Sequence, residues 1–99
     1  MKKGGCVYII TNKSNKVLNT GSTTELRGRI WDHITKVNKS CFTARYNCNK
    51  IIWYEVLPTI MEAREREYQI KSYSRAYKIQ LIQRLNPLYK NLWEDIQDL

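Results

Sequence analysis

The chain has 99 residues, which is the length of one small domain. Its hydrophobic content of 42%, with three Trp and seven Tyr, is enough to build a packed core and excludes a largely disordered chain. No apolar run approaches the ~18 residues that a membrane span requires, which excludes a membrane protein. We therefore expect a single domain over residues 1–99.

The N-terminus and the cysteines bear on location. Residues 1–5 are basic, but the apolar stretch that follows, Cys6 to Ile10, is too short for a secretory signal. Cys6, Cys41 and Cys48 are odd in number and none lies within four residues of another, which argues against a disulfide framework and a structural zinc site. We expect a cytoplasmic protein with reduced cysteines.

The charge is uneven along the chain. The formal net charge is +8, and three of the nine acidic residues lie close to the C-terminus. Residues 68–93 contain no acid but contain five Lys or Arg residues. A basic surface attracts polyanions by releasing their condensed counterions, so nucleic acid is the expected partner. The alternative is that the excess Lys and Arg only keep a small protein soluble.

The first half of the chain predicts a hairpin and a helix. Cys6–Thr11 is typical of a strand, the polar residues 12–16 of a turn, and Val17–Gly21 of a second strand. Thr23 or Thr24 can cap a helix that begins near Glu25. Its inner stripe has residues at helical spacing: Leu26, Ile30, His33 and Val37. A polar stretch follows over residues 38–49.

The second half predicts one strand and further helices. Lys50–Leu57 is the strongest strand pattern, and Pro58 ends it. Thr59 and Glu62 form a capping-box pattern for a helix that continues to Leu85, with a break near residues 72–74. Asn86 and Pro87 stop this run, and the last residues form a short helix or lie along the surface. Strands and helices that do not alternate regularly indicate the α+β class.

Three residues are candidates for chemistry. Arg29 and His33 lie four apart on one helix face, among apolar neighbours, and offer a phosphate-binding guanidinium and a group that titrates near neutral pH. Glu67 follows Ala63 at i+4 and precedes Ile70, so it lies on an inward stripe where a carboxylate must be paired or bind a metal. For each residue a structural explanation is open: an Arg at the rim of the core, a core His, and a Glu paired with an Arg such as Arg29.

Tyr8 is a strand tyrosine, for which packing is the ordinary expectation. Taken one at a time, none of these residues establishes catalysis. Their order along the chain carries more information, and it resembles the GIY-YIG nuclease superfamily, in particular its small single-domain proteins related to the nuclease domain of bacterial excision repair. The matching segments, which span roughly residues 5–93, are Cys6-Val7-Tyr8, Asn19-Thr20-Gly21, Leu26–His33, Phe42–Asn47 with Ile52–Glu55, Glu67–Lys71 and Leu85-Asn86-Pro87.

The resemblance implies a small three-stranded antiparallel sheet flanked by helices and the hydrolysis of a phosphodiester. Glu67 would hold one Mg²⁺ or Mn²⁺ ion, and Arg29 would neutralise charge on the phosphate oxygens. Tyr8, assisted by His33, would accept a proton from the attacking water or orient it. Asn86 would anchor the site.

The chain also departs from the family pattern. Cys6 replaces the leading glycine of the first tripeptide, and Ser22 stands where some relatives have lysine. The larger departure is Asn19, at the position of the second tripeptide's tyrosine, because an amide cannot act as a phenolic base. Asn19 therefore decides between an active nuclease and a nuclease-like module.

The sequence as a whole predicts a metal-dependent DNA endonuclease of DNA repair or processing. The alternatives are a nuclease-fold module that binds nucleic acid without cutting it, and a purely structural or protein-interaction domain. A monomer and a homodimer both fit. The expected catalytic residues are Tyr8, Asn19, Arg29, His33 and Asn86, the metal ligand is Glu67, and the nucleic-acid contacts are Arg27, Lys71, Arg75 and Lys78.

Overall fold

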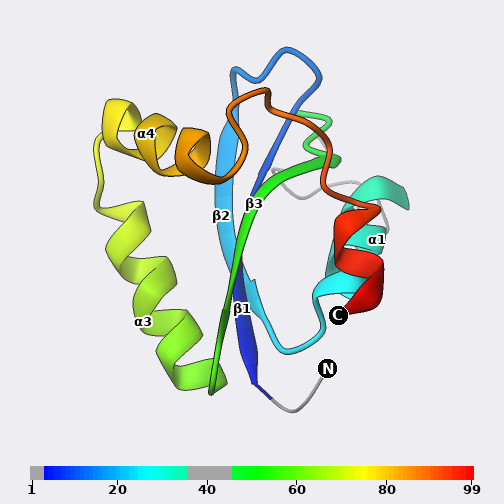
Figure 1. Ribbon diagram of the computed structural model, residues 1–99, viewed down its shortest axis with the longest axis vertical. Coiled ribbons are helices and arrows are strands. Elements are labelled where there is room, and N and C mark those ends of the chain that lie inside the picture. The colour runs from blue at the N-terminus through cyan, green and yellow to red at the C-terminus, as the bar shows by residue number, and fades with distance from the viewer. Residues whose placement is uncertain (1–3, 36–45) are drawn as a thin grey trace.

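A three-stranded antiparallel sheet forms the centre of the molecule. The computed structural model describes residues 4–35 and 46–99. The strands β1 (Gly5–Thr11), β2 (Leu18–Thr23) and β3 (Lys50–Leu57) lie in the order β2-β1-β3, so the first strand is central (Figure 1). β1 and β2 form a hairpin, in which the Asn12 side chain accepts from the backbone N–H groups of Lys16 and Val17 and closes the turn.

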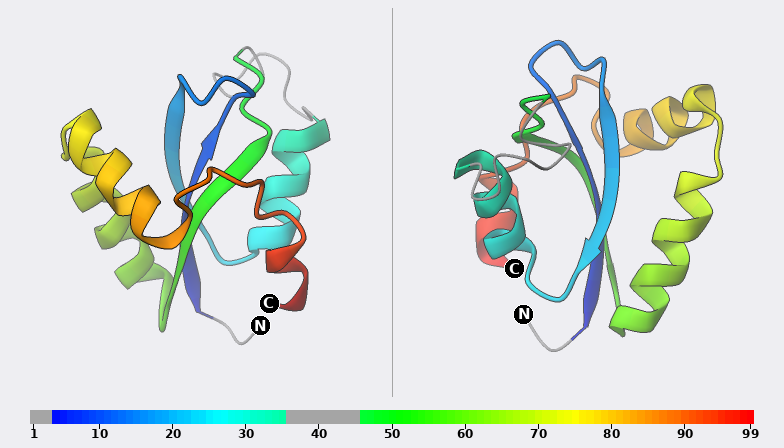
Figure 2. Two further views of the ribbon diagram at one scale, coloured as in Figure 1. Left: turned by 45° about the horizontal axis from the view of Figure 1, so that its top comes forward. Right: turned by 180° about the vertical axis from the view of Figure 1, so that it is seen from behind.

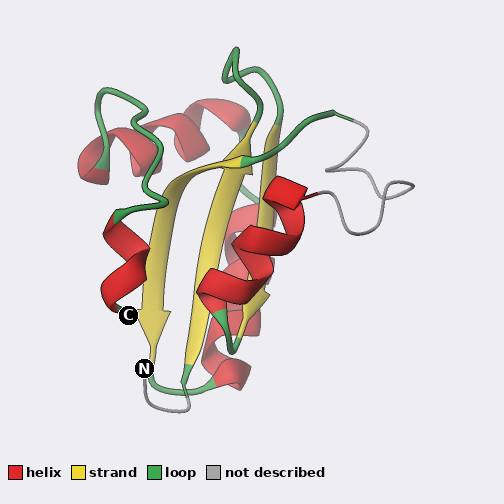
Figure 3. Ribbon diagram, turned by 90° about the vertical axis from the view of Figure 1, so that its right-hand side faces the viewer, coloured by secondary structure: helices red, strands yellow, loops and turns green. Residues whose placement is uncertain are grey.

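Helices cover both faces of this sheet. On one side lie α1 (Leu26–Thr35) and the short 3₁₀ helix η1 (Asp95–Asp98), which contact each other. On the other side lie α3 (Ile60–Lys71) and α4 (Arg75–Leu85), and Figures 2 and 3 show the sheet between these two layers. The chain is therefore α+β, as the sequence predicts.

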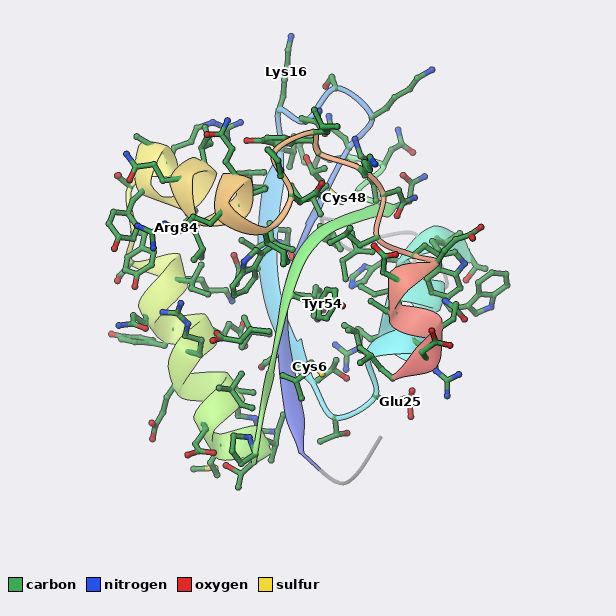
Figure 4. The ribbon with its side chains drawn as sticks, viewed as in Figure 1. Cys6, Lys16, Glu25, Cys48, Tyr54 and Arg84 are labelled. Carbon is green, nitrogen blue, oxygen red and sulfur yellow. The ribbon has the colours of Figure 1, made fainter. Side chains whose placement is uncertain are left out.

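Alternation along β1 divides the core into two halves. Successive strand residues face opposite sides of a sheet, and every residue of β1 is buried. Cys6, Tyr8 and Ile10 belong to the half beneath α1 and η1, together with Leu26 and Ile30. Figure 4 shows Cys6 and Tyr54 on this side of the sheet. The half beneath α3 and α4 is formed by Val7, Ile9, Ile52, Trp53, Ala63, Ile70 and Ile82.

A β-bulge adjusts the pairing of β1 with β3. Ile9 pairs with Trp53 but Ile10 pairs with Ile51, so Ile52 is the extra residue on β3. The bulge allows Ile51 to join the core half beneath α1 while Ile52 joins the half beneath α3. Tyr8, on the other side of the irregularity, stays opposite Tyr54.

Most of the predicted elements are confirmed. The break between the last two helices is real, and the Thr59 side chain caps α3 by accepting from the Glu62 backbone N–H. The second strand begins one residue later than predicted and ends at Thr23 rather than Gly21. The first helix begins at Leu26, and Thr23 accepts from the Glu25 backbone N–H just before it.

Other predictions are tested less fully. Val37 and most of the polar stretch 38–49 lie outside the described residues. The closing helix is present as η1, a single 3₁₀ segment. Among the described residues, the helices are all too short or too polar to cross a membrane.

Candidate active site

Tyr8 lies at the centre of the sheet, between two cross-strand neighbours. On β2 it faces Gly21, and on β3 it faces Tyr54. The Tyr8 ring folds over Gly21 so closely that a Cβ atom at position 21 would lie 2.5 Å from the Tyr8 Cζ atom and closer still to the hydroxyl oxygen. Glycine is thus required at position 21 because the tyrosine ring occupies the space of a side chain.

Helix α1 brings two polar side chains to the Tyr8 hydroxyl. Tyr8 Oη lies 3.3 Å from His33 Nε2, and the rings are tilted by 58°. The Arg29 guanidinium hydrogen-bonds the same tyrosine. Leu26 and Ile30 are the buried residues of α1 and fix the rotation of the helix about its axis. Arg29 and His33 therefore lie on the side of α1 that meets Tyr8.

The protonation of these groups follows from their surroundings. Burial raises the pKa of Tyr8 and the nearby Glu67 charge adds to this, although the charge and hydrogen bond of Arg29 act to lower it. Burial also lowers the pKa of His33, Arg29 lowers it further, and Asp32 partly opposes both. Tyr8 is therefore a neutral phenol at neutral pH and His33 a neutral imidazole. In this state His33 Nε2 accepts from the Tyr8 hydroxyl in one imidazole tautomer and donates to it in the other.

Glu67 approaches the site from the opposite layer. It projects from α3 and lies against β2, where the Ser22 hydroxyl donates to its Oε1 at 2.5 Å. Lys71, one turn further along α3, lies 2.6 Å from Oε2. The partner of this inward carboxylate is thus Lys71, rather than the Arg29 that the sequence suggested as one explanation.

The carboxylate of Glu67 is ionised. Burial alone raises its pKa, but the hydrogen bonds from Lys71 and Ser22 and the charges of Lys71 and Arg64 outweigh burial and lower it. The side chain retains 21% exposure. The result is a charged oxygen donor that is held in place on one side and open to solvent on the other.

Consecutive residues of β2 connect the two layers. Gly21 faces the Tyr8 side of the sheet, and Ser22, the next residue, faces the α3 side and binds Glu67. Arg29 and His33 act directly on the Tyr8 hydroxyl, and Glu67 lies close enough for its charge to raise the pKa of Tyr8.

Two predicted site residues lie elsewhere in the arrangement. Asn19 pairs with Ile10, so it lies on the Tyr8 face of the edge strand, two residues from Gly21. Asn86 is 4% exposed and makes its hydrogen bonds to backbone: Nδ2 donates to the carbonyls of Ile52 and Lys90, and Oδ1 accepts from the Lys90 N–H. These bonds hold the segment after α4 against β3, so Asn86 stabilises the fold.

The predicted nucleic-acid contacts do not form one patch. Arg27 lies on α1 and donates to the Gln97 backbone carbonyl near η1. Arg75 and Lys78 lie on α4, in the opposite layer, where Arg75 donates to the Asn15 carbonyl of the hairpin turn. Of the four, Lys71 alone is in contact with a candidate site residue, Glu67, among the contacts described for residues 4–35 and 46–99.

Sequence reasoning overlooked the roles of Ser22 and Tyr54. Strand alternation predicts both positions. A residue that follows a site residue on a strand faces the other side of the sheet, and a residue opposite it on the next strand faces the same side. Ser22 was noted only as a departure from lysine. Its hydroxyl instead holds the Glu67 carboxylate.

The chemistry of the site suits a metal ion held mainly by substrate and water. Within the described ranges, no three His, Cys, Asp or Glu side chains gather into a ready-made cage. Mg²⁺ commonly takes one or two protein carboxylates and completes its shell with water and phosphate oxygens. An ionised, partly exposed glutamate fits this mode of binding.

Comparison with known families agrees with this geometry. The model of the GIY-YIG catalytic domain matches residues 4–80. The chain belongs to the GIY-YIG family, a family of nucleases.

Its relatives are small proteins of similar length. A UPF0213 protein of Staphylococcus haemolyticus is 34% identical over 77 residues, which cover 78% of this chain and 92% of the relative. A UPF0213 protein of Syntrophus aciditrophicus is 35% identical over 81 residues, covering 82% and 91%. The solution NMR structure of the UPF0213 protein BH0048 from Bacillus halodurans superposes with a TM-score of 0.56 at 29% identity, covering 88% of this chain and 90% of that one.

Proposed function

We propose that this protein is a metal-dependent DNA endonuclease that hydrolyses phosphodiester bonds. The proposal depends on one observation: Tyr8, His33 and Arg29 are in contact on one side of the sheet, and the ionised Glu67 on the other side lies near enough for its charge to act on Tyr8. A phosphodiester nuclease requires a proton acceptor, a positive clamp and a metal-binding carboxylate, and these four residues provide them.

Proton transfer is assigned to Tyr8 and His33. The Tyr8 hydroxyl oxygen accepts a proton from the attacking water as its own proton passes to His33 Nε2, 3.3 Å away. The attacking oxygen forms a bond to phosphorus, and the bond to the leaving oxygen breaks. The neutral His33, whose pKa is lowered mainly by burial, is ready to take up this proton at neutral pH.

Charge stabilisation is assigned to Arg29. Its guanidinium, at an exposed position on α1, hydrogen-bonds Tyr8 and can also face a phosphate. A fixed positive fork beside the reacting phosphorus stabilises the charge that develops on the non-bridging oxygens. The same charge favours transient negative charge on the Tyr8 oxygen.

Glu67 would hold the divalent ion, Mg²⁺ or Mn²⁺. When bound, such an ion polarises the phosphate and stabilises the leaving oxygen. Ser22 fixes one carboxylate oxygen by its hydrogen bond. Lys71 is paired with the other oxygen and would have to release it for Glu67 to hold an ion there.

DNA is the proposed substrate because the chain carries a net charge of +8 and belongs to a nuclease family. A role in DNA repair or processing follows from the family resemblance. One site of this kind cuts one strand, so a monomer makes a nick and a double-strand break requires a homodimer or two binding events.

The experiment is a nicking assay on supercoiled plasmid and on branched DNA, with Mg²⁺, Mn²⁺ or EDTA. Glu67→Ala should abolish metal-dependent cutting, because it removes the carboxylate that would hold the ion. Glu65→Ala, an exposed acid on the same helix, is the matched control and should cut like the wild type. Cutting that persists in Glu67→Ala would overturn the assignment.

One observation favours a second candidate, a module that binds nucleic acid without cutting it. Asn19 lies on the Tyr8 face of β2, where the family has a second tyrosine. Asn19→Tyr tests this alternative. A large gain in nicking would show that Asn19 weakens the site, whereas salt-sensitive binding with no nicking in either protein would establish the binding module.

A further inference from the structure

The outer surface of α3 next to Glu67 has a composition that the proposed reaction does not use. Tyr68 directly follows the proposed metal ligand and is 80% exposed, the highest exposure among the large hydrophobic side chains described in residues 4–35 and 46–99. An exposed side chain of this size contributes little to folding, and its position next to Glu67 makes the ring accessible to a ligand bound at the site.

The residues around Tyr68 define what that ligand is. At about 100° per residue, the order around α3 from Glu67 is Lys71, Arg64 and Tyr68, all within roughly a quarter to a third of a turn. Lys71 contacts the Glu67 carboxylate directly, and the charge of Arg64 reaches it. We call the surface formed by Arg64, Tyr68 and Lys71 the α3 platform.

The α3 platform combines one flat aromatic ring with two cations. Proteins that hold single-stranded nucleic acid use this combination, because cations follow the phosphates while an aromatic face stacks on an unpaired base. Bases inside a duplex are stacked on each other and offer no free face to a side chain on a helix surface. Glu67 lies at one edge of this surface and is paired with Lys71, and the next acid, Glu65, lies around the helix on the other side of Tyr68.

We propose that the α3 platform is a subsite for an unpaired nucleobase, so that the preferred substrate is single-stranded or locally opened nucleic acid. Tyr68 stacks on the base, while Arg64 and Lys71 contact its flanking phosphates. Contact of Lys71 with a phosphate also draws it away from Glu67 Oε2. This inference rests on the proposed function, because it takes the phosphate next to the stacked base as the one beside Glu67.

The test measures binding without cutting. Fluorescence anisotropy in EDTA compares a labelled dT20 strand, an rU20 strand and a 20-base-pair DNA duplex, for the wild type, Tyr68→Ala, Tyr68→Phe and Met61→Ala. Tyr68→Ala should weaken binding to single strands by about fivefold to a hundredfold, and Tyr68→Phe should retain it. Met61, 62% exposed seven residues earlier on α3, is the matched control and should have little effect.

A spectroscopic readout separates stacking from general charge. The fluorescence of 2-aminopurine in a single strand should be quenched by the wild type and by Tyr68→Phe but not by Tyr68→Ala. Binding of dT20 and rU20 identifies DNA or RNA as the source of the base. Equal binding of single strands by Tyr68→Ala and wild type, or an equal loss on single strands and duplex, would overturn the proposal.

The outcome is independent of the nuclease assignment. If nicking fails while Tyr68-dependent stacking is observed, the platform serves a module that binds without cutting. If nicking depends on Glu67 while stacking is absent, the enzyme acts on DNA without this subsite.

Discussion

The two layers of the candidate site differ in how firmly they are built. On the α1 side, Tyr8 is 3% exposed, held between Gly21 and Tyr54, and hydrogen-bonded to His33, its proposed proton acceptor. On the α3 side, Glu67 is partly exposed and its second oxygen is occupied by Lys71. The proposed proton-transfer groups are thus fixed by the core, while the proposed metal ligand lies at an edge of the sheet and shares its charge with Lys71.

The largest expected effect comes from disturbing the buried layer. Gly21→Ala forces the Tyr8 ring to move, and misplacement by about 1 Å can lower a rate roughly a hundredfold. Overpacking should also cost about 1–3 kcal/mol of stability. Initial nicking rates and thermal unfolding measure both. Gly28→Ala is the matched control, because its Cβ meets only the flexible Glu25 side chain and the helix should become up to about 1 kcal/mol more stable. A wild-type rate in Gly21→Ala would show that Tyr8 tolerates displacement.

The next effect concerns stability rather than rate. It tests a residue that holds the fold together and lies in neither layer of the candidate site. Asn86→Ala removes three hydrogen bonds, one to the backbone of β3 and two to the backbone of the segment that follows α4. The free energy of unfolding, measured in urea, should fall by about 2–4 kcal/mol. The nicking rate of the folded protein should change little. Asn91→Ala, which removes one exposed bond to the Trp93 N–H, is the control. A collapse of the rate without loss of stability would place Asn86 in the reaction itself.

A smaller effect is expected at the exposed layer. Lys71→Met removes a partly exposed ion pair, which is worth about 0.2–1 kcal/mol, so Mn²⁺ should bind about 1.4-fold to fivefold more tightly. Electron paramagnetic resonance of free Mn²⁺ measures this affinity without any reaction. Lys90→Met, in an exposed loop, should leave the affinity unchanged. Weaker binding in Lys71→Met would mean that Lys71 supports the ion site instead of competing for it.

The smallest effect is a titration shift in the buried layer. The chain has one histidine, so the imidazole resonance of His33 is unambiguous by NMR. Its pKa lies below the ordinary value because of burial and Arg29, and Asp32 raises it, so Asp32→Asn should lower the pKa further. Arg29→Gln should raise it.

The same titration has a consequence for stability. The folded state binds a proton to His33 less readily than the unfolded chain does, so this group reduces stability as pH falls through the unfolded pKa. The loss levels off below the lowered folded pKa. His33→Gln should remove that dependence, and a pH-independent difference between the two proteins would contradict the assignment.

Sequence reasoning reached the elements because their signals are local. The β-branched and aromatic pattern of Lys50–Leu57 and the cap at Thr59 need no tertiary information, and both are confirmed. The hairpin followed from two strand patterns around a polar turn, and the sheet flanked by helices followed from the family resemblance of six ordered segments. The placement of Asn19 is also a local matter, because side-chain alternation along β2 puts it on the same face as Gly21 and therefore on the Tyr8 face.

The partners of the site residues could not be predicted in this way. Glu67 faces inward by helical spacing, but the spacing does not choose between Arg29 and Lys71, because the choice depends on how α3 lies on β2. The scatter of Arg27, Arg75 and Lys78 over two layers has the same origin. Charge counts along a chain describe how basic it is and leave open where the charges meet.

Position 21 also constrains how this protein can change over generations. The space above that glycine belongs to the Tyr8 ring, so a larger residue there requires either that the ring moves or that position 8 becomes smaller. A smaller residue at position 8 has no phenol to offer His33. Positions 8 and 21 are therefore expected to change together, because loss of the glycine alone would displace the Tyr8 hydroxyl from His33.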